Sequence, residues 1–450
     1  MIKKQNQIKR NSPSDVKRVL AMQRLFTVTA AVAVLMGAAI VITLGARLIA
    51  KAGRFAISAN SQNTVVPIIS TEPETTTSIV YQTEKLADDE LSDNYWGPLD
   101  ELPEDSIKTH THNEIHGIYI GSCSALDSAI ELCNNSELNA VVIDIKNEWG
   151  IPFNCSNETA RQIGYVWDAY DIDEVIAKCH ENNILVIGRI VSFNDCTAAE
   201  HFPERSIRDK DGNTLLFSNE SSHPFLSPYN KDNWDYLISI AEEAASHGLD
   251  EIQFDYVRFP AGSTTTGSSP YYGEDSTTPS KSAAINRFLQ EARIRIQDKL
   301  GVPVSADIFG IVLTSGLDAA NIGQDFTTLG MTGIDSCCPM TYPSHYALGT
   351  KIGGHTFDYP DKEPYMLVYS VLQACKNTFS QTGFTNVRPY LQAFTASYIG
   401  AGNYMDYGYA QINTQIKALH DLGMNEYILW DPNCRYPAGS YDGDMSVSDD

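Results

Sequence analysis

Two acidic residues at the ends of neighbouring predicted strands are the features of this sequence best suited to chemistry. The stretch EIQFDYVRFP, residues 251–260, places Asp255 at the end of an otherwise apolar strand, and PVSADIFG, residues 303–310, carries Asp307 at the corresponding place. Two carboxyl groups at the carboxyl ends of successive parallel strands can act as nucleophile and acid/base at a glycosidic bond. Asp255 and Asp307 are therefore the candidate catalytic residues.

Other polar and aromatic residues follow the same and neighbouring strands, where hydroxyl groups and sugar rings would be bound. Strand two ends in Asp144, Lys146, Glu148 and Trp149. The candidate substrate-binding residues are Asp144, Trp149, Arg189, Tyr256, Arg258, Tyr342, His345, Tyr346, Trp430 and Asp431.

Each candidate also has a structural interpretation. Asp255 could be held in a buried ion pair by Arg189 or Arg258, Asp144 could pair with Lys146, and Asp307 could cap the turn before Gly310. For any one aromatic residue, ordinary packing is the more frequent role. Buried acids without a role are rare, which favours function for Asp255.

Short runs rich in β-branched residues alternate with amphipathic stretches from His116 onward. Apolar residues at three- and four-residue spacing predict helices over 126–133, 172–183, 234–248 and 283–300. Such alternation predicts right-handed βαβ units and a parallel sheet. The eight predicted strands are 117–121, 140–146, 184–190, 251–259, 303–310, 336–342, 387–394 and 426–432.

Eight units predict an α/β fold of the (β/α)8 TIM-barrel type, with one irregularity at its end. After the eighth strand the chain is polar and rich in glycine, so the eighth helix is predicted to be missing or atypical. Either the barrel is bare there, or the segment before the first strand covers it. Long loops at 191–230 and 261–281 follow strands three and four and are expected to border the site.

The amino-terminal part predicts a membrane anchor and a tether. Residues 25–46 are uncharged and long enough to span a bilayer, and the basic residues within 1–24 predict a cytoplasmic amino terminus. A cleaved signal peptide is the alternative, although its apolar core would be shorter. The predicted organisation is a cytoplasmic tail (1–24), a transmembrane helix (25–46), a flexible extracytoplasmic linker (47–111), the barrel (112–436) and a disordered polar tail (437–450).

Charge and motifs exclude several classes of function. The net charge is −24, and because residues 1–54 contain ten basic residues and one acid, the remainder carries −33. So acidic a body argues against nucleic acid and anionic phosphate polymers as partners. No CxxC, HExxH, Walker or GxGxxG motif occurs, and the HxH pair at His110 and His112 precedes the first strand, so no metal or cofactor is expected. Several of the nine cysteines are most simply buried thiols, although a disulfide or two remains open.

Several motifs together resemble a known family. They are AVVIDIKNEWG, ILVIGRIVSFND, NWDYLISIAEEAASHGLDEIQFDYVRFP, VSADIFG, IGQDF, PMTYPSHY and RPYLQAF, in this order across residues 115–436. The chain resembles the glycoside-hydrolase-like domain of bacterial envelope proteins, a family catalogued as being of unknown function and related to α-amylase-like barrels. The resemblance implies a (β/α)8 fold and glycosidase chemistry with Asp255 as nucleophile. Where those barrels usually place a glutamate acid, this chain has Asp307.

The expected function is thus a membrane-anchored, extracytoplasmic glycoside hydrolase with a retaining mechanism, acting on a polysaccharide or cell-surface glycan. The alternative is a barrel that binds envelope glycan without cleaving it. A third interpretation is a scaffold within an envelope complex. The first two are distinguished by whether Asp255 and Asp307 face an open cleft or are held in arginine pairs.

Overall fold

The protein is described by a computed structural model, which covers residues 114–121, 123–273, 278–379 and 386–443. The predicted cytoplasmic tail (1–24), transmembrane helix (25–46) and linker (47–111) lie outside these residues, as do His110 and His112. Within the described part of the chain, no helix is both long and apolar enough to cross a membrane.

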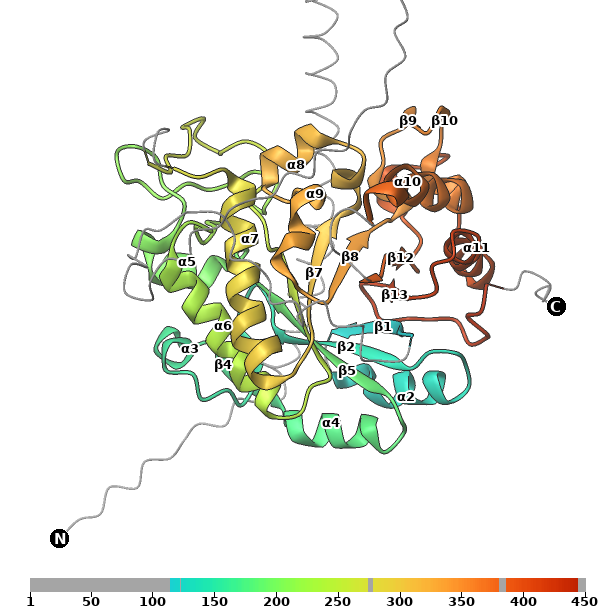
Figure 1. Ribbon diagram of the computed structural model, residues 1–450, viewed down its shortest axis with the longest axis horizontal. Helices are drawn as coiled ribbons and strands as arrows, with labels where there is room; N and C mark the ends of the chain where they lie inside the picture. The colour runs from blue at the N-terminus through green and yellow to red at the C-terminus, as the bar shows by residue number, and fades with distance from the viewer. Residues whose placement is uncertain (1–113, 122, 274–277, 380–385, 444–450) are drawn as a thin grey trace, which may run out of the picture.

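Eight parallel strands close into a barrel, as predicted (Figure 1). The register confirms closure, because Ile118 of the first strand pairs with Leu429 of the last and with Val141 of the second. A short extra strand, β11 (Asn386–Val387), extends the pairing of β8 before β12 takes over. In order around the barrel the strands are β1 (His116–Gly121), β2 (Ala140–Lys146), β5 (Leu185–Val191), β6 (Glu251–Asp255), β7 (Val304–Phe309), β8 (Ser336–Met340), β12 (Tyr390–Gln392) and β13 (Tyr427–Trp430).

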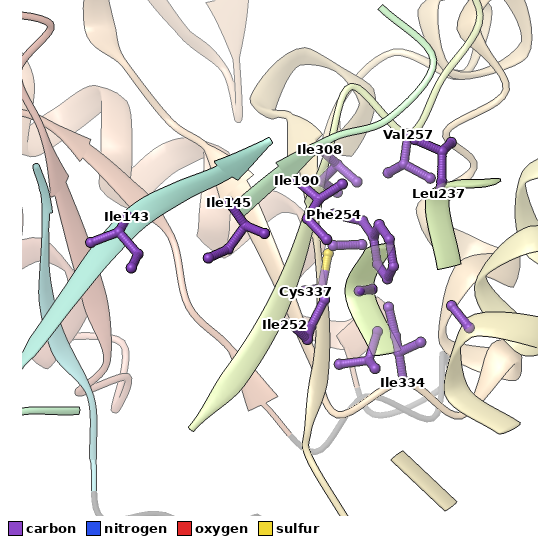
Figure 2. Packing of buried hydrophobic residues seen from close by; sticks show 14 of the residues in the cluster. Ile143, Ile145, Ile190, Leu237, Ile252, Phe254, Val257, Ile308, Ile334 and Cys337 are labelled. Carbon is purple, nitrogen blue, oxygen red and sulfur yellow. The ribbon is translucent and has the colours of Figure 1, made fainter. Parts of the chain in front are cut away.

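Helices surround the barrel and bury the outer faces of its strands. Figure 2 shows Ile252 and Phe254 of β6 packed with Ile190, Ile308 and Leu237, all of which are fully buried. Because side chains alternate along a strand, the residues between them, Gln253 and Asp255, face the interior of the barrel. The helices are α2 (Leu126–Asn134), α3 (Glu158–Ile163), α4 (Ile172–His180), α5 (Cys196–His201), α6 (Lys231–Ser246), α7 (Lys281–Ala292), α8 (Gly316–Ile322), α9 (Phe326–Leu329), α10 (Pro364–Phe379) and α11 (Tyr409–His420).

Insertions lie mainly at the carboxyl ends of the strands. The small pairs β3 (Ile151–Phe153) with β4 (Val166–Tyr170), and β9 (Thr350–Ile352) with β10 (His355–Phe357), follow β2 and β8. The two long predicted loops contact each other, since Thr265 N–H donates to the carbonyl of Leu216 (2.8 Å) and Ser218 N–H to that of Ser263 (3.0 Å). They form one layer beside the ends of β5 and β6.

No helix follows β13 in the described residues, as predicted. The chain is nevertheless ordered as far as residue 443, and it covers part of the barrel beside β13. Tyr441 is fully buried, and its carbonyl accepts a hydrogen bond from the Tyr427 hydroxyl (2.6 Å). Residues 437–443, the first part of the predicted polar tail, thus pack against the barrel, and the rest of that tail lies outside the described residues. A groove of about 690 Å³ remains between α2 and residues 434–439.

The nine cysteines are all described, and all are free thiols. Seven are buried, among them Cys337 and Cys338 on β8. The interpretation of buried thiols is confirmed, and the disulfides that the sequence left open do not form.

Candidate active site

The carboxyl ends of β2, β5, β6 and β7 bring three of the predicted acids around one arginine. Arg189 of β5 donates from Nη1 to Asp144 (2.6 Å) and from Nε and Nη2 to Oδ2 of Asp255 (2.9 and 2.5 Å). The strand register explains the arrangement, because Asp144 pairs with Arg189 and Val191 pairs with Asp255. The sequence left open whether Arg189 or Arg258 would pair with Asp255, and the structure shows the pair with Arg189.

Asp307 is the register neighbour of Asp255. The last pair between β6 and β7 joins Phe254 to Ala306, so the residues that follow, Asp255 and Asp307, lie side by side and face inward. Strands of a sheet lie about 4.8 Å apart, which brings the two carboxyl groups close together. The sequence predicted both acids at the ends of neighbouring strands, and the register places them beside each other there.

Asp307 has no hydrogen-bond partner, although it is almost completely buried. Its side chain belongs to a residue only 1% exposed, and neither Oδ1 nor Oδ2 has a partner among the described residues. Burial raises the pKa of Asp307 well above its ordinary value, and the nearby charge of Asp255 raises it further. The protonated form is favoured, and a protonated carboxyl group can donate a proton.

Asp255, in contrast, accepts hydrogen bonds from N–H groups only. Besides Arg189, the backbone N–H of Tyr256 donates to Oδ1 (2.6 Å). Tyr256 adopts a φ of +50°, an uncommon conformation for a residue other than glycine, and so turns the chain at the end of β6. Strain of this kind collects at functional sites, which agrees with the place of Asp255 in the barrel.

Asp144 completes the group around Arg189. It accepts from the Tyr119 hydroxyl (2.8 Å) as well as from Arg189. Burial raises the pKa of Asp144, although both of these partners act in the opposite direction. The alternative partner, Lys146, instead contacts Asp195 (2.9 Å), so the local salt bridge that the sequence left open does not form.

Aromatic rings lie against this group. Trp430 stacks on Tyr119 with ring centroids 3.9 Å apart, and the Arg189 guanidinium lies 5.5 Å from the centroid of each ring. The Tyr342 hydroxyl is buried and has no partner among the described residues. Burial, together with the charges of Asp307 and Asp255, raises the pKa of Tyr342 well above its ordinary value. Trp430 and Tyr342 thus lie within the same site as the acids.

The remaining predicted binding residues make their contacts with residues other than the acids around Arg189. Arg258 is buried in an ion pair with Glu220 (2.8 Å), and Glu220 also accepts from the N–H of Ala261 (2.9 Å). This pair joins the two long loops. The Trp149 ring contacts His223 edge-on, and the exposed His345 contacts Tyr342 in the same way. Tyr346 packs with Ile352 and Phe357. Asp431 accepts a hydrogen bond from the N–H of Asn433.

Three residues of the site were not among the predicted ones: Tyr119, Glu148 and Glu220. Tyr119 lies inside an apolar strand, and Glu220 lies in a loop 38 positions from Arg258, so neither has a local signal. Glu148 did have one, since it follows the end of β2 directly. Glu148 is a half-buried residue, and burial raises the pKa of its carboxyl group. The charge of Arg189 lowers this pKa, and those of Asp144 and Asp255 raise it.

Comparison with known proteins matches residues 115–436 to a family described as "Putative glycosyl hydrolase domain". The chain belongs to this family. No curated protein matches the chain.

Among solved structures, a hypothetical protein from Ruminiclostridium thermocellum ATCC 27405 is 36% identical, over 42% of this chain and 96% of that one, with a TM-score of 0.37. The PgaB (BpsB) glycoside hydrolase domain from Bordetella bronchiseptica is 13% identical, over 71% and 94%, with a TM-score of 0.48. The catalytic domain of β-amylase from Paenibacillus polymyxa is 13% identical, over 73% and 96%, with a TM-score of 0.43.

Proposed function

We propose that this member of the glycosyl hydrolase family is a membrane-anchored enzyme that cleaves a polysaccharide or cell-surface glycan outside the cytoplasm, with retention of configuration. Asp255 attacks the anomeric carbon, and Asp307 protonates the departing oxygen. The glycosyl group then leaves Asp255 when water attacks, and Asp307 takes the proton of that water.

The observation that carries the proposal is the contrast between the two neighbouring acids. Asp255 accepts three N–H donors, whereas Asp307 has neither a donor nor a cation in contact. Environments that differ in this way separate the protonation of two carboxyl groups and suit one as nucleophile and the other as acid. Their adjacency across β6 and β7 agrees with the separation of about 5 to 5.5 Å that retention requires.

The surrounding residues are assigned to substrate binding. Asp144 and Arg189 would hold hydroxyl groups of the sugar beside Asp255, and the stacked pair of Trp430 and Tyr119 offers an aromatic face. Tyr342 would donate its free hydroxyl. Trp149, Tyr256, His345, Tyr346 and Asp431 are proposed to contact other parts of the glycan. Arg258 would act through Glu220 by fixing the loops.

Anchoring rests on the sequence alone. Residues 25–46 would span the membrane with residues 1–24 in the cytoplasm, and residues 47–111 would hold the barrel away from the bilayer. The glycan substrate would then belong to the envelope or its surroundings.

The second candidate function is glycan binding without cleavage. It is favoured by the arginine pair of Asp255 and by the exposure of only 3% for Asp255 and 1% for Asp307. A sugar must reach both carboxyl groups for hydrolysis. Burial of Asp307 in the unliganded barrel is therefore the observation against which hydrolysis has to be tested.

The experiment is a screen of residues 112–450 against a glycan panel, in parallel with Asp255→Asn and the exposed control Asp211→Asn. Hydrolysis predicts that reducing ends appear with the unsubstituted barrel and the control and not with Asp255→Asn. Equal release by Asp255→Asn would refute its role as nucleophile. Binding of a glycan with no release by any of the three would support the second function.

A further inference from the structure

The site contains more carboxyl groups than a retaining hydrolase needs. Asp144 and Asp255 contact Arg189, Asp307 lies on the next strand beside Asp255, and Glu148 lies two residues beyond the end of β2, although hydrolysis uses two carboxyl groups. Arg189 donates to Asp144 and Asp255, which leaves the other two without an ion pair in the described part of the chain. The surplus acid distinguishes this site from a minimal catalytic pair.

Three other buried cations of the barrel are already neutralised. Lys146 contacts Asp195 (2.9 Å), Arg258 contacts Glu220 (2.8 Å), and Arg388 contacts Glu251 (2.8 Å). None of these cations is in an ion pair with Glu148 or Asp307 in the structure as described. Negative charge that is partly removed from water is costly unless a cation is supplied.

Glu148 is held rigidly at the end of β2. Asn147 and Gly150 exchange backbone hydrogen bonds, and the Asn147 side chain accepts from the N–H groups of Trp149 and Gly150 (2.9 and 3.1 Å). Cys196 also donates to the carbonyl of Glu148 (3.4 Å). Glu148 as a residue is half-buried, which places it between the barrel interior and the surface.

A second and independent observation indicates that polar ligand groups belong here. In the part of the chain that the structure describes, both oxygens of Asp307 and the hydroxyl of Tyr342 are buried without partners. Buried polar groups of a folded protein are nearly always hydrogen-bonded. Unmet groups beside the acids therefore match a ligand that brings donors.

We propose that the substrate contains sugar units with a free, protonated amino group, and that the Glu148 carboxylate receives this ammonium group. This inference rests on the proposed function, because it describes the same site. An ammonium group supplies three donors and a positive charge, which a neutral or acetylated sugar lacks. Uronic acids and sulfated sugars would be rejected, since their charge would face the surplus carboxylates.

The test is a calorimetric titration of the full-length chain with glucosamine oligomers and with N-acetylglucosamine oligomers, at about pH 6, where the amine is protonated. We expect the glucosamine oligomer to bind more tightly, and Glu148→Gln to weaken it about tenfold while leaving the acetylated oligomer unchanged. The matched control is Glu174→Gln, an exposed acid on α4. Equal affinity of the two oligomers, or no effect of Glu148→Gln, would overturn the inference.

Two further titrations test the inference if the Glu148 variant fails to fold or if the site binds a metal ion instead. If Glu148→Gln does not fold, raising the salt concentration must weaken binding of glucosamine oligomers to the unsubstituted chain and spare the acetylated ones. Calcium chloride alone is the second arm, and Glu148-dependent binding of calcium without binding of glucosamine would overturn the inference. Cleavage is scored separately, so Glu148-dependent binding without cleavage supports this inference while it refutes hydrolysis.

Discussion

The barrel contains two buried charge networks, one at each end, and they differ in how completely they are satisfied. At the amino-terminal end of the strands, Arg388 contacts Glu251 and Glu426, and Ser305, Ser336 and Asn386 join them. At the carboxyl end, Arg189 contacts Asp144 and Asp255, while Asp307 and Tyr342 have unpartnered atoms.

The difference teaches which network serves stability and which serves function. Both are buried in the same barrel, so their desolvation is comparable. Breaking a fully paired buried network leaves an uncompensated charge and is costly to the fold. Unmet polar atoms instead cost free energy in the intact protein and persist where a ligand will meet them. The position of each end agrees, because active sites of such barrels lie at the carboxyl ends of the strands.

The largest effect should come from removing the cation of the paired network. Arg388→Met leaves Glu251 and Glu426 buried without their partner, so we expect the free energy of unfolding to fall by about 3 to 5 kcal/mol. Urea unfolding followed by circular dichroism measures it. A loss below about 1 kcal/mol would show that the network is not stabilising.

A smaller effect of opposite sign is expected for Asp307→Asn. The carboxyl group has no partner to lose, so the free energy of unfolding should stay within about 1 kcal/mol or rise. Cleavage should nevertheless fall by about a hundredfold or more, because the proton donor is gone. Destabilisation by more than about 2 kcal/mol would indicate a structural role that the contacts do not show.

The same residue predicts a pH dependence of stability. Its pKa is raised on folding, so the folded state binds the proton more tightly than the unfolded state, where an aspartate has a pKa of about 4. The stabilisation is complete below that value and is lost as the pH rises towards the folded pKa. Unfolding measured from about pH 4 to 8 should therefore show a decline that Asp307→Asn lacks, and parallel curves would contradict the raised pKa.

The smallest effects come from a matched pair of tyrosines. The Tyr390 hydroxyl donates to Gln253 (2.5 Å), so Tyr390→Phe should cost about 1 kcal/mol. The Tyr342 hydroxyl has no partner, so Tyr342→Phe should be neutral and should instead weaken glycan binding. Thermal unfolding compares the two, and equal losses would remove the distinction between satisfied and unsatisfied groups.

The sequence predicted the strands well because each combines β-branched residues with a polar residue at its end. The placement of Asp255 and Asp307 followed from this pattern, since parallel strands end at the same side of a sheet. The partner of each acid did not follow. Arg189 could have bonded to either neighbour. The order β2, β5, β6 places it between the two acids, and its side chain donates to both Asp144 and Asp255.

The contacts missed by sequence reasoning are long-range. Glu220 reaches Arg258 from a loop that itself packs on another loop. Tyr119 reaches Asp144 from β1, the strand next to β2 in the barrel but 25 positions away in the sequence. The carboxyl-terminal residues gave a misleading signal for a related reason. Their composition is polar, but they make specific contacts. The Tyr441 carbonyl accepts from Tyr427 of β13, and the Gly443 N–H donates to Asn413 of α11.

The most direct test of the account compares Asp255→Asn with Glu426→Gln, one acid from each network, by cleavage and by urea unfolding. We predict that Asp255→Asn loses about a thousandfold in cleavage and keeps its free energy of unfolding within about 2 kcal/mol, because Arg189 retains Asp144. Glu426→Gln should show the reverse, with lowered stability and normal cleavage per folded molecule. Cleavage retained by Asp255→Asn, or lost by both variants alike, would contradict the division of the barrel into a stabilising end and a catalytic end.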